Sequence, residues 1–216
     1  EMCIRDSLKR LRFTTSHPKD LSDELIEVIK RNDNICKYFH LPLQSGSSKV
    51  LKDMNRHYDQ EKYLERVRKL KEEIPEIAIS TDIIVGYPTE TEEDFKETLK
   101  VCEIARYDTA FTFKYSPRPK TRAAKLRPLE DDVVQERFDR LLDVLYPHFY
   151  EKNKTYIGKT VEVLLESESK NNPEVLTGRT DDYKLVHVKA DKSLIGEFVK
   201  VKINENTSFT ISGDLV

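Results

Sequence analysis

Hydrophobic and polar positions follow two different patterns along this chain, and the first pattern covers roughly its first 150 residues. Short apolar runs with strand character alternate there with amphipathic stretches of helical periodicity. The sequence predicts strands at residues 11–15, 38–43, 77–85 and 109–115. It predicts helices from Ser22 onward and at residues 47–54, 60–74, 91–105 and 131–152. Strands that alternate with helices of this length are typical of βαβ units, so we expect an α/β domain with a parallel sheet.

A second pattern, with period two and frequent glycines, begins near residue 153. Four of the six glycines lie from Gly158 onward, and apolar residues alternate with polar ones at 161–165, 199–203 and 209–211. This pattern is typical of a small antiparallel β-barrel. We therefore expect an α/β domain over residues 8–152 and a β-barrel over residues 153–216. Residues 1–7 resemble a translated sequencing adaptor, and we interpret them as a non-native leader.

Each of the four predicted strands in the α/β domain has one polar and one apolar face. The polar faces hold Arg12, Thr14 and Ser16, then His40 and Gln44, then Ser80 and Asp82, then Thr112, Lys114 and Ser116. In the last strand, Phe111 and Phe113 are assigned to the apolar face. A closed eight-stranded barrel fills its interior with aliphatic side chains, and a doubly wound sheet is apolar on both faces. The pattern therefore favours a parallel sheet curled into an open, partial barrel around a large polar ligand.

Several residues of these faces and of the tail suit ligand binding. Asp82 suits a ribose hydroxyl or a ligand amine, and Gly46 allows the backbone to approach a ligand closely. Arg118, just beyond the fourth strand, suits a carboxylate in bidentate geometry. In the tail, the cations Lys159, Arg179, Lys184 and Lys202 suit an anion such as phosphate, and Tyr183 suits a stacking contact.

Composition narrows the class of protein. The 216 residues carry 37 Lys+Arg and 39 Asp+Glu, a formal net charge of -2, so RNA affinity requires local basic patches. No stretch has the length of about 18 apolar residues that a membrane span needs, and we expect no membrane association. Three cysteines at unrelated spacings do not predict a disulfide framework, which favours a reducing, cytoplasmic setting. The six glycines assemble neither of the common phosphate-binding loops.

A set of motifs in a defined order resembles the MiaB-type tRNA methylthiotransferases. The resemblance runs from about residue 8 to 216 and rests on Phe13–Pro18, His40–Ser47, Met54–Arg56, Ser80–Glu92 and Tyr115–Pro119. In the tail, Gly158–Val163 and Thr177–Thr180 resemble the signature stretches of a TRAM domain, a small RNA-binding β-barrel. Lys120 and Arg122 depart from the glycine and proline that are usual in that family.

The resemblance implies a radical S-adenosylmethionine enzyme that adds a methylthio group to C2 of N6-isopentenyladenosine next to the anticodon. It implies S-adenosylmethionine and two [4Fe-4S] clusters as cofactors, the tRNA anticodon stem-loop as partner, and a monomer. The implied cofactor-binding residues are Arg12, Thr14, His40, Gln44, Ser80 and Asp82. The implied substrate- and RNA-binding residues are Ser116, Arg118, Lys159, Arg179, Lys184 and Lys202.

The family's Cys-x-x-x-Cys-x-x-Cys motif is not present in these 216 residues, so we assign neither cluster ligands nor catalytic residues. We expect the chain to be the carboxyl-terminal part of such an enzyme, with the first barrel strands missing, and to be inactive by itself. Three alternatives remain open: a sister enzyme acting on threonylcarbamoyladenosine in tRNA, one acting on a ribosomal protein, and a non-catalytic RNA-binding module. An α/β-barrel metabolic enzyme is disfavoured by the glycine spacing and the β-barrel tail.

Overall fold

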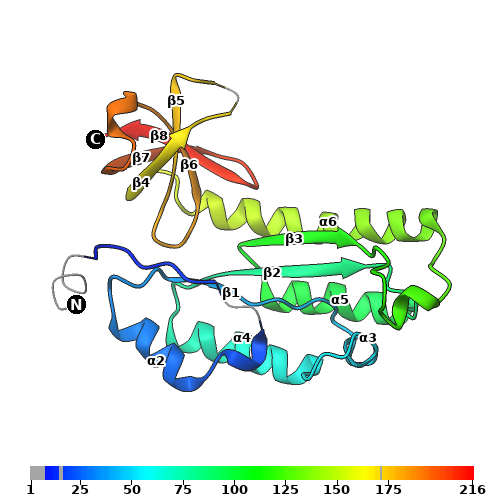
Figure 1. The fold of residues 1–216 in the computed structure, drawn as a ribbon. Coiled ribbons are helices and arrows are strands. Elements are labelled where there is room, and N and C mark those ends of the chain that lie inside the picture. The colour runs from blue at the N-terminus through cyan, green and yellow to red at the C-terminus, as the bar shows by residue number, and fades with distance from the viewer. Residues whose placement is uncertain (1–7, 15–16, 171) are drawn as a thin grey trace.

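The computed structural model describes residues 8–14, 17–170 and 172–216, which form an α/β part and a β-barrel (Figure 1). Three parallel strands make the sheet in the order β1-β2-β3: β1 (Tyr38–His40), β2 (Ala78–Val85) and β3 (Thr109–Lys114). The α-helices are α2 (Asp23–Arg31), α3 (Ser48–Asp53), α4 (Gln60–Glu73), α5 (Glu92–Ala105) and α6 (Asp131–Lys154). Two short 3-10 turns, η1 (Pro18–Asp20) and η2 (Ala123–Lys125), complete this part.

Side-chain caps explain where the helices begin. Ser22 accepts a hydrogen bond from the Leu25 amide at the start of α2. Thr91 and Asp94 form a capping box at the start of α5, each side chain accepting from the other residue's amide. Such caps satisfy amide groups that have no partner inside the helix. The helical positions predicted from the sequence are thereby confirmed.

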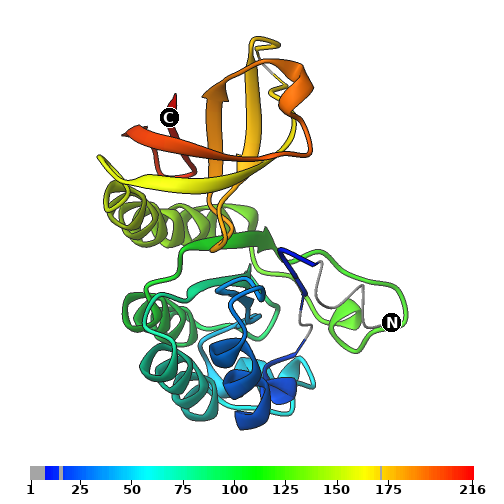
Figure 2. The same ribbon diagram turned by 90° about the vertical axis from the view of Figure 1, so that its left-hand side faces the viewer.

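Helices cover one face of the sheet, and the other face stays open. Figure 2 shows α4, α5 and α6 gathered on one side of the strands. The side chains pointing to that side are fully buried, as predicted from their spacing: Phe39, Leu41, Leu43, Ile79, Ile83 and Val85. Among the described residues, no helix is long and apolar enough to cross a membrane.

The prediction of a strand at residues 11–15 is wrong in the part that the structure describes. Leu11 makes only an isolated parallel bridge with Ile35, and residues 15 and 16 lie outside the described residues. The polar side chains explain the difference, because they bond to the barrel instead of lining the sheet. Arg10 donates to the Arg179 carbonyl (2.9 Å) and Arg12 to the Thr180 carbonyl (3.1 Å).

The assignment of faces in β3 is also wrong. The register places Phe111 beside Asp82 and Phe113 beside Ile84, so both rings lie on the open face of the sheet. They are 50% and 51% exposed. Lys114 lies on the other side, where it donates to Gln135 of α6 and lies over the Phe138 ring. Alternation along a strand defines two faces, but the helix that packs against the strand decides which of them is covered.

The barrel closes with five strands in the order β4-β5-β6-β8-β7. They are β4 (Thr160–Glu168), β5 (Val175–Arg179), β6 (Leu185–Lys189), β7 (Phe198–Asn206) and β8 (Thr210–Leu215), with the turn η3 (Lys192–Leu194) between β6 and β7. Inward residues such as Val163, Val186 and Ile203 form its buried core. The pair β6–β8 is parallel, so the barrel is mixed and not purely antiparallel as predicted.

A buried ion pair connects the loop after β2 to α6. Arg137 Nη1 lies 2.8 Å from Glu90 Oε1, and Glu90 also accepts the Gly86 amide at 3.1 Å. Burial raises the pKa of Glu90, although the Gly86 amide and Arg137 oppose this effect. Loss of one partner leaves a buried charge without compensation.

Replacing Arg137 by methionine should therefore lower the free energy of unfolding by about 3–5 kcal/mol, measured by urea denaturation. Arg140→Met is the matched control on the same helix, since Arg140 pairs with Glu92 and Glu136 at the surface, where such pairs contribute about 0–1 kcal/mol. The double variant Glu90→Gln/Arg137→Met should recover part of the loss. Equal losses in the two single variants would contradict this role.

Candidate functional site

Neighbouring strands bring three of the predicted cofactor-binding residues together on the open face. The register pairs His40 of β1 with Ser80 of β2, and His40 Nδ1 lies 2.8 Å from Ser80 Oγ. His40 Nε2 lies 3.5 Å from Asp82 Oδ2. The Tyr38 hydroxyl also reaches Ser80 Oγ, at 2.5 Å. Tyr38 shares the strand face of His40 and is a site residue that the sequence analysis missed.

This cluster combines an anionic group with aromatic surfaces. The Asp82 carboxylate is 29% exposed, and the Phe111 ring lies edge-on to His40 with centroids 6.1 Å apart. Burial raises the pKa of Tyr38, so its hydroxyl stays neutral and is able to donate at physiological pH. The arrangement suits a ligand that carries hydroxyl or ammonium donors beside a flat ring.

The other predicted cofactor-binding residues lie elsewhere. Gln44 is buried and continues the sheet through its backbone, donating to the Asp82 carbonyl (2.8 Å) at a φ of 66°. Thr14 is exposed. Arg12 pairs with Glu166 of the barrel (2.7 Å) and lies over the Tyr183 ring (5.0 Å). Cofactor binding by these three residues stays a prediction.

Gly46 serves a close approach to a helix and not to a ligand. A Cβ at this position would lie 2.4 Å from the Thr98 Cα of α5. The Gly46 amide donates to Thr98 Oγ1 at 2.9 Å. The structure therefore assigns this glycine to helix packing, which corrects the sequence interpretation.

The candidate RNA-binding residues divide into two groups. Lys159 and Lys202 are exposed on the barrel, and Ser116 and Arg118 are exposed beyond β3. Arg179 stacks on Tyr183 (4.0 Å) and pairs with Glu166 (3.3 Å). Lys184 is buried, with its ammonium 2.8 Å from Asp108. Arg179 and Lys184 thus lie at the junction between the two parts, and RNA binding by all six residues stays a prediction.

Asp108, just before β3, organises this junction. Its carboxylate accepts from the Ile79 amide (3.0 Å), from Lys152 of α6 (2.6 Å) and from Lys184 of the barrel (2.8 Å). Burial raises the pKa of Asp108, but the two ammonium groups outweigh it and hold the pKa below its ordinary value of 3.8. The backbone of Tyr183 has a φ of 72°. Its ring stacks on the ring of Tyr38, with centroids 4.5 Å apart.

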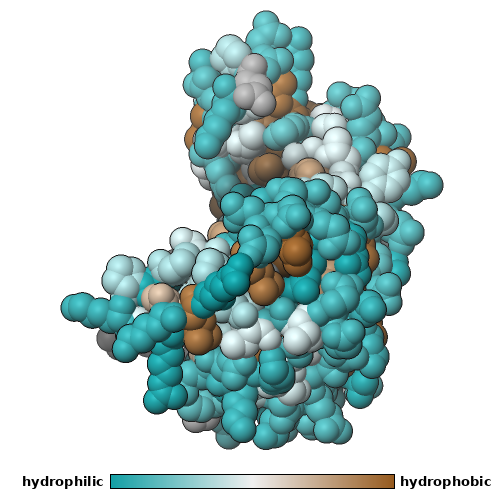
Figure 3. Space-filling model, turned by 90° about the vertical axis from the view of Figure 1, so that its right-hand side faces the viewer, coloured by the Kyte–Doolittle hydropathy of each residue, from teal (hydrophilic) through white to brown (hydrophobic). Residues whose placement is uncertain are grey.

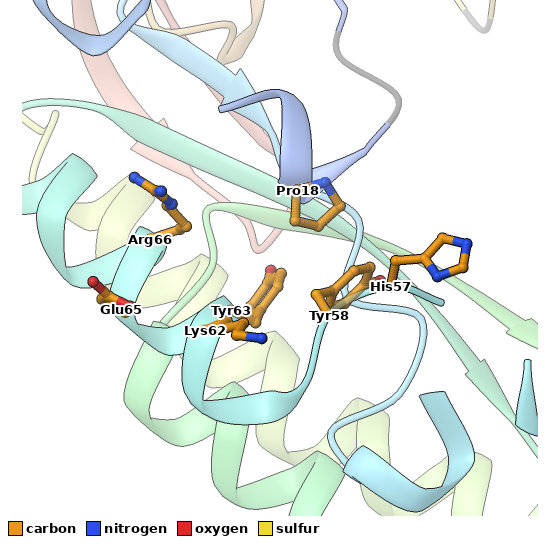
Figure 4. A pocket seen from close by; sticks show the side chains of 7 residues that line it. All are labelled: Pro18, His57, Tyr58, Lys62, Tyr63, Glu65 and Arg66. Carbon is orange, nitrogen blue, oxygen red and sulfur yellow. The ribbon is translucent and has the colours of Figure 1, made fainter. Parts of the chain in front are cut away.

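Two cavities lie away from the open face. One of about 270 Å³ is shown in Figure 4. Its lining residues are Pro18, His57, Tyr58, Lys62, Tyr63, Glu65 and Arg66. A second of about 330 Å³ lies between the amino-terminal segment and the barrel and is lined by Arg10, Tyr156 and Glu162, among others. Neither contains a residue predicted to bind the cofactor or the RNA substrate.

The described residues do not fit an iron–sulfur cluster. Cys36 and Cys102 are both buried, and burial raises the pKa of each thiol, whereas a cluster ligand must be a thiolate. No group of three metal-ligating side chains occurs in residues 8–14, 17–170 and 172–216. We derive no step through a cluster from these residues.

The pairing of Asp108 predicts how stability responds to pH. A carboxylate with a depressed folded-state pKa stabilises the fold above its unfolded pKa, and this contribution is lost as pH falls through the folded pKa. Asp108→Asn should lower the free energy of unfolding by about 3–5 kcal/mol at pH 7, and the difference from wild type should shrink below pH 4. Urea denaturation from pH 3 to 7 measures this, with Asp143→Asn, an exposed position on α6, as control. A pH-independent difference would contradict this account.

Two protein-family models match this chain, one in the α/β part and one in the barrel. The radical SAM superfamily matches residues 1–102. The TRAM domain matches residues 154–216. Residues 103–153 lie between the two matches. The solved structure of coproporphyrinogen III oxidase (HemN) from Escherichia coli, a radical SAM enzyme, covers 80% of this chain and 46% of its own, with a TM-score of 0.55 at 14% identity, which shows the fold alone.

Curated relatives are similar over almost the whole chain. The tRNA-2-methylthio-N(6)-dimethylallyladenosine synthase of Finegoldia magna is 56% identical over 212 residues, which are 98% of this chain and 46% of the relative. The protein of the same name from Clostridium perfringens strain SM101 is 52% identical over 97% of this chain and 47% of the relative. The chain thus spans about half the length of the curated relatives it matches. The chain thus contains a radical SAM region and a TRAM domain, and over almost its whole length it is similar to tRNA-2-methylthio-N(6)-dimethylallyladenosine synthases.

Proposed function

We propose that this chain forms the cofactor- and RNA-binding part of a tRNA methylthiotransferase that modifies C2 of N6-isopentenyladenosine next to the anticodon. The observation that carries the proposal is the cluster of His40, Ser80 and Asp82 on an open sheet face. The chain is 56% identical to the tRNA-2-methylthio-N(6)-dimethylallyladenosine synthase of Finegoldia magna. The radical SAM match implies S-adenosylmethionine and an iron–sulfur cluster. We propose two [4Fe-4S] clusters in the active enzyme, with ligands outside the described residues.

The side chains of the open face carry hydrogen-bonding groups and an aromatic ring that suit the binding of S-adenosylmethionine. S-adenosylmethionine, when bound, supplies the methyl group and the adenosyl group from which the radical arises. Asp82 is placed to accept from its ammonium group or its ribose hydroxyls. Ser80 fixes the orientation of His40 through the 2.8 Å contact, and Phe111 offers an exposed ring beside them. These groups bind and orient the cofactor, and no catalytic residue is assigned.

The RNA partner is proposed to be the anticodon stem-loop. The TRAM match and the tRNA named in the relatives support tRNA as the partner. Lys159 and Lys202 provide exposed cations on the barrel, and beyond β3 Arg118 provides an exposed cation and Ser116 an exposed hydroxyl. We propose that the enzyme works as a monomer in the cytoplasm. A sister enzyme acting on threonylcarbamoyladenosine in tRNA or on a ribosomal protein side chain, and a non-catalytic RNA-binding module, are the alternatives that the experiments below separate.

The role of Asp82 is testable by cofactor binding. Asp82→Asn keeps the shape but removes the charge, and loss of a charge-assisted hydrogen bond of about 1.5–3 kcal/mol should weaken S-adenosylmethionine binding about 10- to 100-fold. Isothermal titration calorimetry on the 216-residue chain measures this. Glu76→Gln, at an exposed position near β2, is the control and should bind as wild type. Equal affinity in the Asp82 variant would contradict the assignment.

The substrate is testable in a chimeric enzyme. We expect that this chain, replacing the aligned 212 residues of the Finegoldia magna relative, supports methylthiolation of tRNA carrying N6-isopentenyladenosine. Mass spectrometry of digested tRNA detects the product, and the same chimera with Asp82→Asn should be at least tenfold slower. Modification only of tRNA carrying threonylcarbamoyladenosine, or only of a ribosomal protein, would overturn the proposal in favour of a sister enzyme. Binding without any turnover would favour the non-catalytic module.

A further inference from the structure

The segment after β3 concentrates positive charge in a chain of nearly neutral net charge. No acidic residue occurs between Asp108 and Glu130. The basic loop, which we define as residues 117–127, carries Arg118, Lys120, Arg122, Lys125 and Arg127. All five side chains belong to exposed residues. Like charges held close together repel one another, so such a loop is stabilised by an anionic partner.

Among the described residues, carboxylates pair with one of the five cations of the basic loop and leave the other four without an ion pair. Arg127 pairs with Glu130 at 2.7 Å, and both side chains are well exposed. In the part of the chain that the structure describes, Arg118, Lys120, Arg122 and Lys125 are in ion pairs with no carboxylate. Four cations of the basic loop are therefore available to an external anion.

The basic loop has a defined conformation that fixes the spacing of its charges. Thr121 Oγ1 donates to the Arg118 carbonyl (2.9 Å) and accepts the Ala124 amide (3.3 Å). Ala123 is buried in a small cluster with Val50 and Tyr87. Cations that are already ordered lose less entropy when they bind, which favours a ligand with regularly spaced charges.

Lys120 adopts a backbone conformation that favours glycine. Its φ is 70°, in the left-handed region, where a residue with a Cβ is strained. Strain that is retained at an exposed position points to a role for the side chain. The lysine adds a cation at the turn, where glycine would relieve the strain but remove the charge.

The position of the basic loop relates it to the open face. β3 carries the exposed rings of Phe111 and Phe113 and runs directly into the loop. The barrel lies at the opposite end of the sheet (Figure 1). Seen from the ends of the strands, the surface is hollowed between the barrel and a projecting hydrophilic lobe (Figure 3). Exposed rings next to clustered cations are typical of surfaces that bind single-stranded nucleic acid by stacking and phosphate contacts.

We propose that the basic loop binds the phosphate backbone of the tRNA substrate, and that it holds the RNA at the end of the sheet opposite the barrel. The choice of RNA as the anionic partner rests on the proposed function. Arg118, Lys120, Arg122 and Lys125 contact phosphates, so their contribution is independent of RNA sequence. The loop lies outside both matched regions and is a second RNA-binding element besides the barrel.

The test measures binding of a fluorescently labelled anticodon stem-loop RNA to the 216-residue chain by anisotropy at several salt concentrations. The variant Arg118→Gln/Lys120→Gln/Arg122→Gln/Lys125→Gln should bind at least tenfold more weakly near 0.1 M salt. The magnitude of the slope of log K against log salt should fall by about 3–4, because each of the four lost phosphate contacts removes about 0.7–0.9. The matched control Lys52→Gln/Lys62→Gln/Arg68→Gln/Lys100→Gln changes the net charge equally at exposed positions and should keep most of the affinity.

Lys120→Gly separates the phosphate contact from folding. It should raise the melting temperature, because the strain is relieved, and still weaken RNA binding. Equal losses in the loop variant and the control, or no RNA binding by wild type, would overturn the inference. An equal loss of binding to anionic phospholipid vesicles would assign the loop to a membrane surface and also overturn it. Because the proposed function is tested by cofactor binding and chimera turnover, its failure is distinguishable from failure of the loop.

Discussion

The need to pair one buried carboxylate, that of Asp108, determines how the two parts of the molecule fit together. The charge lies at the entry to β3, where it accepts from the Ile79 amide, Lys152 and Lys184. These donors come from the sheet, from α6 and from the barrel. A buried charge is tolerated only when its partners are in place, so the junction is specified as a unit. The barrel is thereby held at the amino ends of the strands.

This junction extends into the polar face of the sheet. Tyr183 of the barrel stacks on Tyr38, and the Tyr38 hydroxyl contacts Ser80, which in turn contacts His40. The barrel and the candidate cofactor site therefore share a continuous set of side chains. Arg12 and Arg179 both lie over the Tyr183 ring, at 5.0 and 4.0 Å from its centroid, and these contacts strengthen the junction. The proposed function places RNA on the barrel and the cofactor on the sheet, and this contact would hold the two sites in a fixed relation.

The two ends of the sheet differ in charge and in role. At the amino ends, cations of the barrel are neutralised by Asp108 and Glu166. At the carboxyl ends, four of the five cations of the basic loop are in no ion pair among the described residues, and the fifth, Arg127, pairs with Glu130 at the surface. Ligands of open parallel sheets bind at the carboxyl ends of the strands. The four unpaired cations of the basic loop thus lie at the end of the sheet where such ligands bind.

The pattern of apolar and polar residues determined where the helices and strands of this fold form. Tertiary packing determined which of their faces and side chains are buried. The capping box at Thr91, the apolar face of Ile79 and Ile83, and the β-barrel of the tail follow from spacing and short-range hydrogen bonds, which the sequence states directly. The motifs that contain His40 and Asp82, taken together with those at Phe13–Pro18 and Tyr115–Pro119, predicted the resemblance, and the polar faces of the strands predicted the cluster. Which face of β3 is covered depends on where α6 packs, and alternation alone does not contain that information. The burial of Lys184 depends on Asp108, 76 residues away in the chain, because only the folded structure brings the two charges together.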